Sequence, residues 1–299
     1  MHRYRMTLMS DPKPNKKKKL NGNFARANLR HKVFTKGADR LLGGRLTKAH
    51  AEKGIVLKQI DVPLVGWPKA FDGLRIGHLT DMHYGDLMSV EQGRMAIDLL
   101  KAQSPDIVCF TGDMIDLHCA GAEPLFEALA EVGAPLGAFM VMGNHDYLED
   151  GDQVRAMARA AGVKVLDESV ECFERDGEEL RVAGIDWDRT VKALHTRVNK
   201  VAPHKPHLLL AHNPKAFLGA SKEGIPLTIA GHTHGGQIAT PGRPNVNLAV
   251  GHRLSAGLYR RGDSALFVSV GVGAWFPLRI HCPAEVVVLI PRAASRSIE

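Results

Sequence analysis

Short apolar runs alternate with amphipathic stretches from Ile60 to the C-terminus, and this alternation constrains the fold more than any other feature of the sequence. The run LRIGHLT (74–80) is typical of a buried strand, and a stretch with helical spacing follows it after a potential N-cap at Ser89. Alternation of this kind predicts an α/β fold. The second half of the chain is richer in strands, and the dipeptide Asp176-Gly177 predicts a hairpin turn between two of them.

The basic charge of the chain is concentrated at its N-terminus. Residues 1–58 hold 16 Lys or Arg and 3 Asp or Glu, a net charge of +13, and because the whole chain carries +7, the rest carries −6. The run Lys16–Lys19 lies in a stretch rich in Pro, Asn and Lys that cannot bury a core, so it is predicted to be disordered. We therefore predict a basic, partly disordered N-terminal segment over residues 1–58 and one folded domain over residues 59–299.

Apolar residues recur at loosely helical spacing in the second half of this basic segment. The pattern predicts a basic amphipathic helix that lies on an anionic membrane, where each cation near the surface contributes about 1 kcal/mol. The alternatives are a solvated leader, or a tail that attracts nucleic acid or directs the chain to an organelle. Gly43 and Gly44 interrupt the helical pattern. The apolar positions are Leu29, Val33, Leu41, Leu42 and Leu46.

Several classes of protein are excluded by composition. No apolar stretch approaches the roughly 20 residues that cross a bilayer, and the first residues lack the apolar core of a secretory signal. We therefore expect a cytoplasmic protein, held peripherally on the inner face of the membrane where the basic segment binds lipid. The cysteines have no CxxC spacing, which argues against a disulfide framework and a structural zinc site. They are Cys109, Cys119, Cys172 and Cys282.

Five of the predicted strands end directly in side chains that can bind a metal. Asp81 and His83, for example, follow the strand over residues 74–80 without a break. In open α/β sheets, sites form in the crevice beyond the carboxyl ends of the strands, so we expect these five loops to converge. The potential metal ligands are Asp81, His83, Asp113, Asn144, His212, His232 and His234.

The number and chemistry of these donors predict two metal ions. Seven donors are too many for one tetrahedral site, which takes four, whereas a bridging carboxylate can serve two ions about 3.5 to 4 Å apart. A mixed set of imidazoles and carboxylates suits Mn, Fe, Zn or Ni, of which we favour manganese. We therefore predict two divalent metal ions as cofactors.

Five motifs, in a fixed order, resemble the signature of the calcineurin-like metallophosphoesterases over roughly residues 58–290. They are DMH (81–83), TGDMID (111–116), GNHD (143–146), AHNP (211–214) and GHTHGGQ (231–237). The resemblance implies an α/β fold of four layers, a two-sheet β-sandwich flanked by helices, with the metal site at the C-terminal ends of strands. By motif position, it implies that one metal is held by Asp81, His83, Asp113 and His234, and the other by Asp113, Asn144, His212 and His232. Asp113 would bridge the two.

The same resemblance places His145 as the acid near the leaving group of the reaction. It implies hydrolysis by a hydroxide that the metals activate, and a histidine that titrates near neutrality can supply a proton to the departing oxygen. A purely hydrogen-bonding role for His145 is the alternative. We predict that Asp146 orients His145, with capping of the following segment as the alternative. We predict that Asp116 is not a ligand but supports the ligands of the centre or caps the loop.

Four more residues are candidates for substrate contact, with packing in the core or internal pairing as the alternative reading of each. They are Arg243, Tyr259, Trp275 and Arg279. The C-terminal part of the chain is similar to a bacterial branch of membrane-associated phosphodiesterases, although Ala284 stands where that branch often has proline. That branch includes UDP-2,3-diacylglucosamine hydrolases of lipid A biosynthesis.

The resemblance thus implies a phosphoesterase that cleaves a phosphodiester or pyrophosphate bond, in UDP-2,3-diacylglucosamine or another lipid-linked substrate. A nucleic-acid or cyclic-nucleotide phosphodiesterase is one alternative, and a non-catalytic scaffold stabilised by metals is another. No aromatic residues interleave the N-terminal lysines, so we do not expect nucleic acid as a partner. The sequence indicates no oligomeric state.

Overall fold

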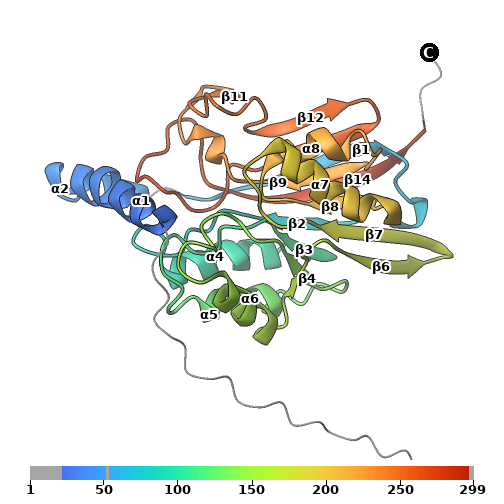
Figure 1. The fold of residues 1–299 in the computed structure, drawn as a ribbon, viewed down its shortest axis with the longest axis horizontal. Helices are drawn as coiled ribbons and strands as arrows, with labels where there is room; N and C mark the ends of the chain where they lie inside the picture. Colours follow the sequence, from blue (N-terminus) through green and yellow to red (C-terminus); the bar gives the residue numbers. More distant parts are fainter. Residues whose placement is uncertain (1–21, 52–53, 296–299) are drawn as a thin grey trace, which may run out of the picture.

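A computed structural model describes residues 22–51 and 54–295; the run Lys16–Lys19, which we predicted to be disordered, lies outside the described residues. Two six-stranded sheets lie face to face, and helices cover the outer face of each (Figure 1). The α/β fold predicted from the sequence, and the four-layer sandwich implied by the resemblance, are therefore confirmed.

The first sheet has the strand order β1-β14-β2-β3-β4-β5. Strands β2 to β5 run parallel, so their carboxyl ends share one edge, whereas β14 is antiparallel to β2. Residues 56–58 already pair with β14, so the sheet begins before residue 59. The strands are β1 (Val56–Val65), β2 (Ile76–Leu79), β3 (Ile107–Phe110), β4 (Ala138–Met140), β5 (Lys164–Val165) and β14 (Glu285–Ala294).

The second sheet has the order β12-β13-β9-β8-β7-β6, and β10 (Ala239–Thr240) and β11 (Arg243–Asn247) form a small separate sheet. The predicted turn at Asp176-Gly177 joins β6 to β7, and both of its residues have positive φ, as such a two-residue turn requires. The strands are β6 (Ser169–Arg175), β7 (Glu178–Gly184), β8 (Leu208–Leu210), β9 (Leu227–Ala230), β12 (Gly257–Arg261) and β13 (Ser264–Val268).

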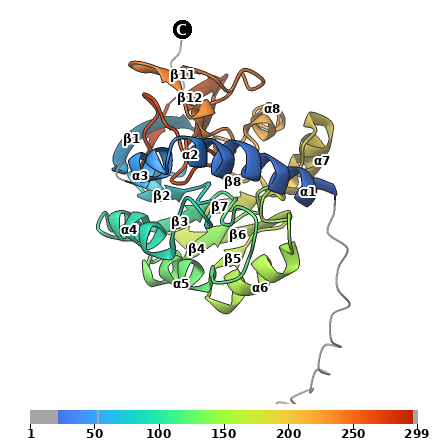
Figure 2. The same ribbon diagram turned by 90° about the vertical axis from the view of Figure 1, so that its left-hand side faces the viewer.

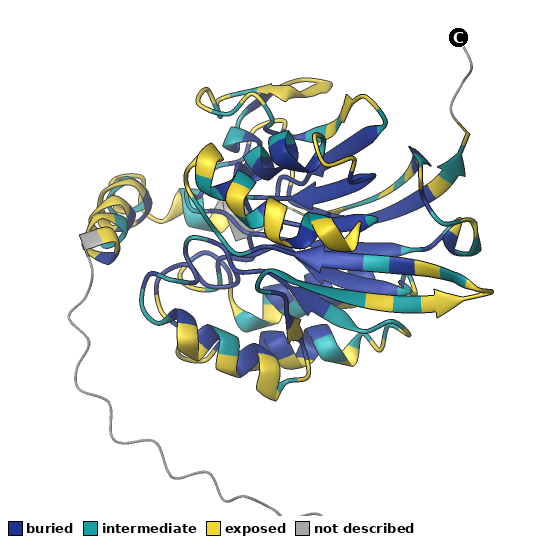
Figure 3. Cartoon of the chain, turned by 45° about the vertical axis from the view of Figure 1, so that its right-hand side comes forward, coloured by how far each residue is buried: buried dark blue, intermediate teal, exposed yellow. Residues whose placement is uncertain are grey.

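Apolar side chains fill the space between the two sheets and the space under each helical layer. Figure 3 shows that the buried residues lie on the inner strands and on the inward faces of the helices. Ser89 caps α4 through a reciprocal capping box with Gln92. Helices α4 (Val90–Lys101), α5 (Glu123–Glu131) and α6 (Gly151–Ala160) cover the first sheet, and α7 (Val191–Val201) and α8 (Phe217–Ala220) cover the second. Short turns of 3₁₀ helix are η2 (Lys69–Phe71), η3 (Ala202–His204), η4 (Pro214–Ala216) and η5 (His234–Gly236).

A helical N-terminal segment crosses one end of the sandwich (Figure 2). It consists of α1 (Gly22–Arg30), the π-helical turns of η1 (His31–Gly37), α2 (Ala38–Leu41) and α3 (Arg45–Ala51). Phe24, His31 and Thr35 are buried, so this side of the segment packs against the domain. Gly43 and Gly44, both with positive φ, separate α2 from α3. The helical character matches the sequence pattern, whereas its packing against the domain was not predicted.

Among the described residues, no helix combines the length and the apolar character that a membrane crossing needs.

Candidate metal centre

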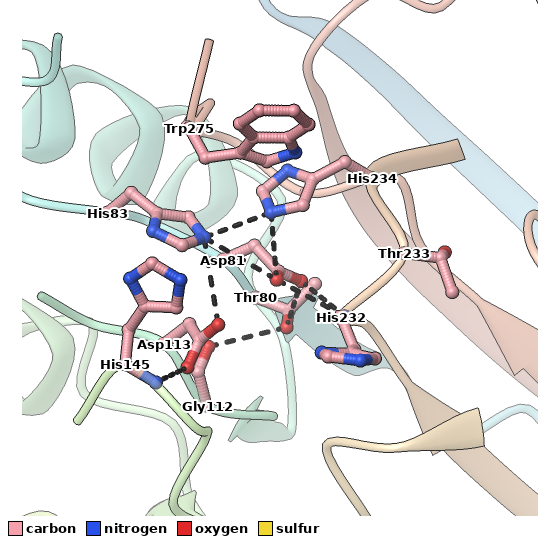
Figure 4. A network of polar contacts seen from close by, with 12 residues as sticks. Thr80, Asp81, His83, Gly112, Asp113, His145, His232, Thr233, His234 and Trp275 are labelled. Carbon is pink, nitrogen blue, oxygen red and sulfur yellow. Dashed lines mark hydrogen bonds and ion pairs between the residues drawn. The ribbon is translucent and has the colours of Figure 1, made fainter. Parts of the chain in front are cut away.

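The loops after β2, β3, β4, β8 and β9 meet at one end of the two sheets, where the sequence predicted a shared site (Figure 4). The polar side chains there form three groups of three. One group, His83 with Asp116 and His145, shares His83 with another group. The other two groups, which we call the two clusters, consist only of predicted ligands. One contains Asp81, His83 and His234, and the other contains Asp113, His212 and His232. Asn144 lines the same cavity as His232. All seven predicted ligands are therefore in or beside the two clusters.

In the first cluster, three ligand atoms point toward one another. Nε2 of His83 lies 2.9 Å from Nε2 of His234, and Nε2 of His234 lies 3.2 Å from Oδ1 of Asp81. The hydroxyl of Thr80 donates to the other oxygen of Asp81 at 2.8 Å, which fixes the carboxylate. The free lone pairs of the cluster thus converge on one point.

In the second cluster, Nε2 of His212 lies 3.1 Å from Oδ2 of Asp113 and 3.2 Å from Nδ1 of His232. The same Oδ2 atom lies 3.7 Å from Nε2 of His83 in the first cluster. Nδ1 of His212 donates to the carbonyl of Thr111 at 2.7 Å, so in the neutral ring Nε2 carries no proton and can bind a cation. Asp113 therefore lies between the two clusters, in the position that a carboxylate bridging two metal ions would occupy.

The backbone at these ligands is held in strained conformations. The φ angles of Asp81, His83, Asp113, His232 and His234 lie between +49° and +73°, in the left-handed region that non-glycine residues rarely adopt. Strain of this kind costs about 1 to 3 kcal/mol per residue and concentrates at functional sites.

Neighbouring glycines make this close approach of the loops sterically feasible. A Cβ atom at Gly143 would overlap the carboxylate of Asp113, and one at Gly231 would overlap the carboxylate of Asp81. Gly143 of the GNHD motif and Gly231 of the GHTHGGQ motif are thus required by packing of the site.

The electrostatics of the clusters favour added positive charge. Burial alone lowers the pKa of a histidine, yet the adjacent buried carboxylates raise the pKa of His83 to about 10 and that of His212 to about 9. Burial lowers the pKa of His232 to about 3 and that of His234 to about 4. Each cluster therefore holds one protonated and one neutral imidazole when no metal is bound. The two protons occupy positions that a divalent cation can take.

The residues present fit two divalent ions. Two pairs of imidazole nitrogens face each other at hydrogen-bonding distance, and Oδ1 of Asn144 is buried without a hydrogen-bond partner among the described residues. A buried amide oxygen without a donor is costly unless a cation or water satisfies it. The donors are imidazole nitrogens and carboxylate or amide oxygens, a set that suits first-row transition metals.

Asp116 supports the centre, as we expected, but through contacts that the sequence did not predict. Its Oδ1 atom lies 3.4 Å from Nδ1 of His83 and 3.2 Å from Nδ1 of His145. Its Oδ2 atom lies 3.2 Å from Nδ1 of His31 in the N-terminal segment. Burial raises the pKa of Asp116, but these imidazoles hold it well below its ordinary value. A carboxylate on the far nitrogen of a metal-binding histidine orients the ring toward the metal.

The predicted contact between Asp146 and His145 is wrong. The carboxylate of Asp146 accepts hydrogen bonds from the backbone N–H groups of Asp113, Met114 and Gly143 at 2.8 to 2.9 Å. Asp146 points away from the ring of His145 because it folds back to tie the GNHD loop to the TGDMID loop. The backbone carbonyl of Asp116, and not the carboxylate of Asp146, lies 2.7 Å from Nδ1 of His145 and orients the ring.

The four candidate substrate residues differ in their surroundings. Arg243 is exposed on β11. The hydroxyl of Tyr259 accepts N–H groups of the 255–256 turn, and Arg279, only 4% exposed, donates to carbonyls of residues 270, 273 and 282. Tyr259 and Arg279 therefore hold loops through internal hydrogen bonds, which was the alternative to substrate contact. Trp275 lies beside the centre, next to His234 in Figure 4.

Sequence reasoning missed the walls of the cavity that opens beside the second cluster. This cavity has a volume of about 750 Å³ and is lined by Asn144, His145 and His232 together with residues of α1. The rings of Trp187 and His252 lie 4.7 and 5.4 Å from that of His232. No ligand motif surrounds His252 in the sequence, so the sequence did not single it out. Trp187 follows β7 as the ligands follow their strands, and that position could have identified it.

Comparisons with known proteins agree with this geometry. Residues 74–236 match the family model described as calcineurin-like phosphoesterase. An uncharacterised metallophosphoesterase of Bacillus subtilis, YkuE, is 29% identical over 74% of this chain and 80% of its own length. An uncharacterised metallophosphoesterase of Aquifex aeolicus is 32% identical over 72% of this chain and 84% of its own length. The phosphodiesterase YaeI of Escherichia coli is 28% identical over 72% and 81%.

Proposed function

The chain belongs to the calcineurin-like phosphoesterase family of metal-dependent phosphoester hydrolases, and on that premise we propose that it cleaves a phosphodiester or pyrophosphate bond in an amphiphilic, lipid-linked substrate. UDP-2,3-diacylglucosamine is the specific candidate that the sequence resemblance raised. The observation that supports hydrolysis most directly is the position of Asp113 between two clusters of imidazole and carboxylate ligands.

Two divalent ions held by these clusters would activate water as the nucleophile and neutralise the charge of the phosphoryl group. The chain's own residues orient the other participants. Nδ1 of His145 donates to the carbonyl of Asp116 and Nε2 accepts from Arg30, so Nε2 would carry a proton for the leaving oxygen once the substrate draws Arg30 away from it. The backbone N–H of His145 donates to Oδ1 of Asp113 at 2.7 Å, which couples the position of this acid to that of the bridging carboxylate.

The outer surface of the N-terminal segment supports an amphiphilic substrate. Leu29, Val33, Phe34, Leu41 and Leu42 are between 51% and 88% exposed, and basic side chains at 32, 36, 40 and 45 lie among them. Exposed apolar side chains interleaved with cations are typical of a helix on an anionic membrane surface. Because this segment crosses the end of the sandwich that holds the metal ligands, contact with a membrane would bring the cavity to the lipid headgroups (Figure 2). We propose such a peripheral contact with the inner face of the membrane.

An activity panel tests the proposed function. The full chain, reconstituted separately with Mn, Fe, Zn and Ni, is assayed against lipid-linked pyrophosphates, cyclic nucleotides, nucleic acid and an activated phosphodiester. We expect turnover of the activated phosphodiester and the greatest kcat/KM on a lipid-linked substrate, with Asp113→Asn inactive. Full metal occupancy without turnover of any substrate would favour the metal-stabilised scaffold instead. A preference for cyclic nucleotides or nucleic acid would assign the enzyme to the other phosphodiesterase class.

A further inference from the structure

The cavity beside the metal centre is unusual in the charge of its walls. Four cationic side chains line it, and no Asp or Glu does. Two of them, Arg26 and Arg30, come from α1 in the N-terminal segment. Of the others, Arg189 lies between β7 and α7, and Lys215 lies in η4. In the part of the chain that the structure describes, no carboxylate lies within ion-pairing distance of any of the four. Unpaired cations that surround a cavity attract an anionic ligand.

The contribution of α1 to this wall is regular. Asn23, Arg26, Ala27 and Arg30 all line the cavity, and their spacing of three, four and seven residues places them on one face of the helix. Phe24 packs against Leu117 and Leu148 on an adjacent face and is 4% exposed, which anchors the start of the helix. The cavity-lining face is thus separate from the apolar residues that we assign to membrane contact.

Contacts further along the segment fix the position of Arg30. One guanidinium nitrogen lies 3.2 Å from Nε2 of His145, and the guanidinium lies 5.1 Å from the centre of the Trp275 ring. The hydroxyl of Thr35 donates to the carbonyl of Trp275 at 3.0 Å, and His31 lies between Asp86 and Asp116. Arg30 is therefore held beside the proposed acid by these contacts, although its side chain is exposed.

The charges of the metal centre balance without the four cations of the cavity wall. Two divalent ions and the two ligand aspartates carry +2, which one hydroxide and one phosphodiester group offset. The cations of the cavity wall are additional to this balance. A cavity of about 750 Å³ is within the roughly 300 to 1,000 Å³ of ligand sites, so it can accept more of the substrate than the reacting group.

We propose that Arg26, Arg30, Arg189 and Lys215 form a subsite for a second phosphate group, so that the substrate class is a phosphate ester with another phosphate beyond the one attacked. The proposal rests on the proposed function for the reacting phosphate. It also makes the N-terminal segment, which lies outside the residues matched by the family model, a determinant of specificity.

Calorimetric binding of inorganic pyrophosphate to the metal-free full chain tests the subsite without catalysis. We expect Arg26→Gln, Arg30→Gln and Lys215→Gln each to weaken binding about 5- to 10-fold, because each removes a charge-assisted hydrogen bond. Arg40→Gln is the matched control, since Arg40 is an exposed arginine of the same segment that does not line the cavity. The Arg40→Gln variant should bind pyrophosphate with the affinity of the wild type. Equal weakening by Arg40→Gln, or no weakening by the other three, would overturn the proposal.

A pair of activated substrates then separates the subsite from the function. The 4-nitrophenyl ester of thymidine 5′-phosphate is compared with the same ester carrying an added 3′-phosphate. We expect the metal-loaded wild type to prefer the second ester in kcat/KM by about 10-fold or more, and Arg26→Gln and Arg30→Gln to bring this ratio toward one. Hydrolysis without any preference contradicts the subsite and leaves the function intact. Loss of pyrophosphate binding in the variants, with neither ester cleaved, supports the subsite and contradicts the function.

Discussion

Nε2 of His83 and Nε2 of His234 lie 2.9 Å apart, although 151 positions separate these residues in the sequence. Two imidazole nitrogens at this distance can share one proton or face one cation together. The carboxylate of Asp81 lies beside both, and all three residues have positive φ angles. Backbone strain of this kind concentrates at functional sites, and the three converging ligand atoms suit a metal cation.

Replacing Gly231 by alanine should disrupt the centre without removing a ligand. The added Cβ would overlap the carboxylate of Asp81 and the hydroxyl of Thr80. We expect a loss of about 1 to 3 kcal/mol in the free energy of unfolding, measured in urea, and at least about a 10-fold fall in kcat/KM. Gly251→Ala is the control, because a Cβ there meets no atom within 4 Å. Equal behaviour of the two variants would show that the site tolerates the displacement.

The His145→Gln variant should lose more activity on substrates whose leaving group needs a proton from an acid. Nε2 of His145 faces the cavity, so its proton matters most when the leaving group is a strong base. We expect kcat to fall about 100-fold or more for an alkyl leaving group and clearly less for 4-nitrophenolate. The measurement is kcat across a series of leaving groups. A uniform loss along the series would leave His145 with the purely hydrogen-bonding role.

His78 should make stability depend on pH. It is fully buried next to Thr111 in the sheet, and burial lowers its pKa from 6.5 to about 3. Between these values the unfolded state binds more protons than the native state, so stability is full above pH 6.5 and decreases as the pH falls. From pH 7 to pH 5 this one group should cost about 2 kcal/mol.

Urea unfolding of the metal-free wild type and of His78→Gln, at pH 7 and pH 5, isolates this contribution. We expect the wild type to lose about 2 kcal/mol more than the variant between the two pH values. His204→Gln serves as the control, because His204 is exposed. A wild type and a variant with parallel pH dependence would mean that His78 is accessible to protons in the native state.

Flotation with vesicles tests the proposed membrane contact. Leu41 is 88% exposed and Leu42 is 51% exposed in the N-terminal segment. We expect the wild type to float with vesicles that contain phosphatidylglycerol, and the double variant Leu41→Asp, Leu42→Asp to bind at least about 10-fold more weakly. Met95→Asp, at a 63% exposed site on α4, should bind as the wild type does. Equal flotation of all three proteins would remove the membrane contact from the proposal.

Much of the fold followed from local patterns. The strand over residues 74–80, the helix after Ser89 and the turn at Asp176-Gly177 each have a physical signal within a few residues, and each is present. Helix α7 was missed even though Val191, Leu194, Val198 and Val201 have helical spacing. Strand β12, at one edge of the second sheet, is short and partly exposed.

The position of the metal ligands followed from a rule about strand ends, which is why all seven predicted ligands lie in or beside the site. The role of Asp146 did not follow from this rule. Adjacent residues in a tight loop point in different directions, and the sequence does not show which one faces the ring of His145. The contacts of Arg30 and His31 with the site could not be predicted either. They depend on how a helix outside the domain motifs packs in three dimensions.

Metal content measures the central claim most directly. The full chain is stripped with a chelator, reconstituted with manganese and desalted, and the bound ions are counted by mass spectrometry and examined by electron paramagnetic resonance. We predict two ions per chain with a spin-coupled signal, because Asp113 would bridge them, and at most one uncoupled ion in Asp113→Asn. Asp98→Asn, an exposed aspartate of α4, should keep both ions. Fewer than two ions in the wild type, or a coupled pair that survives in Asp113→Asn, would contradict the account.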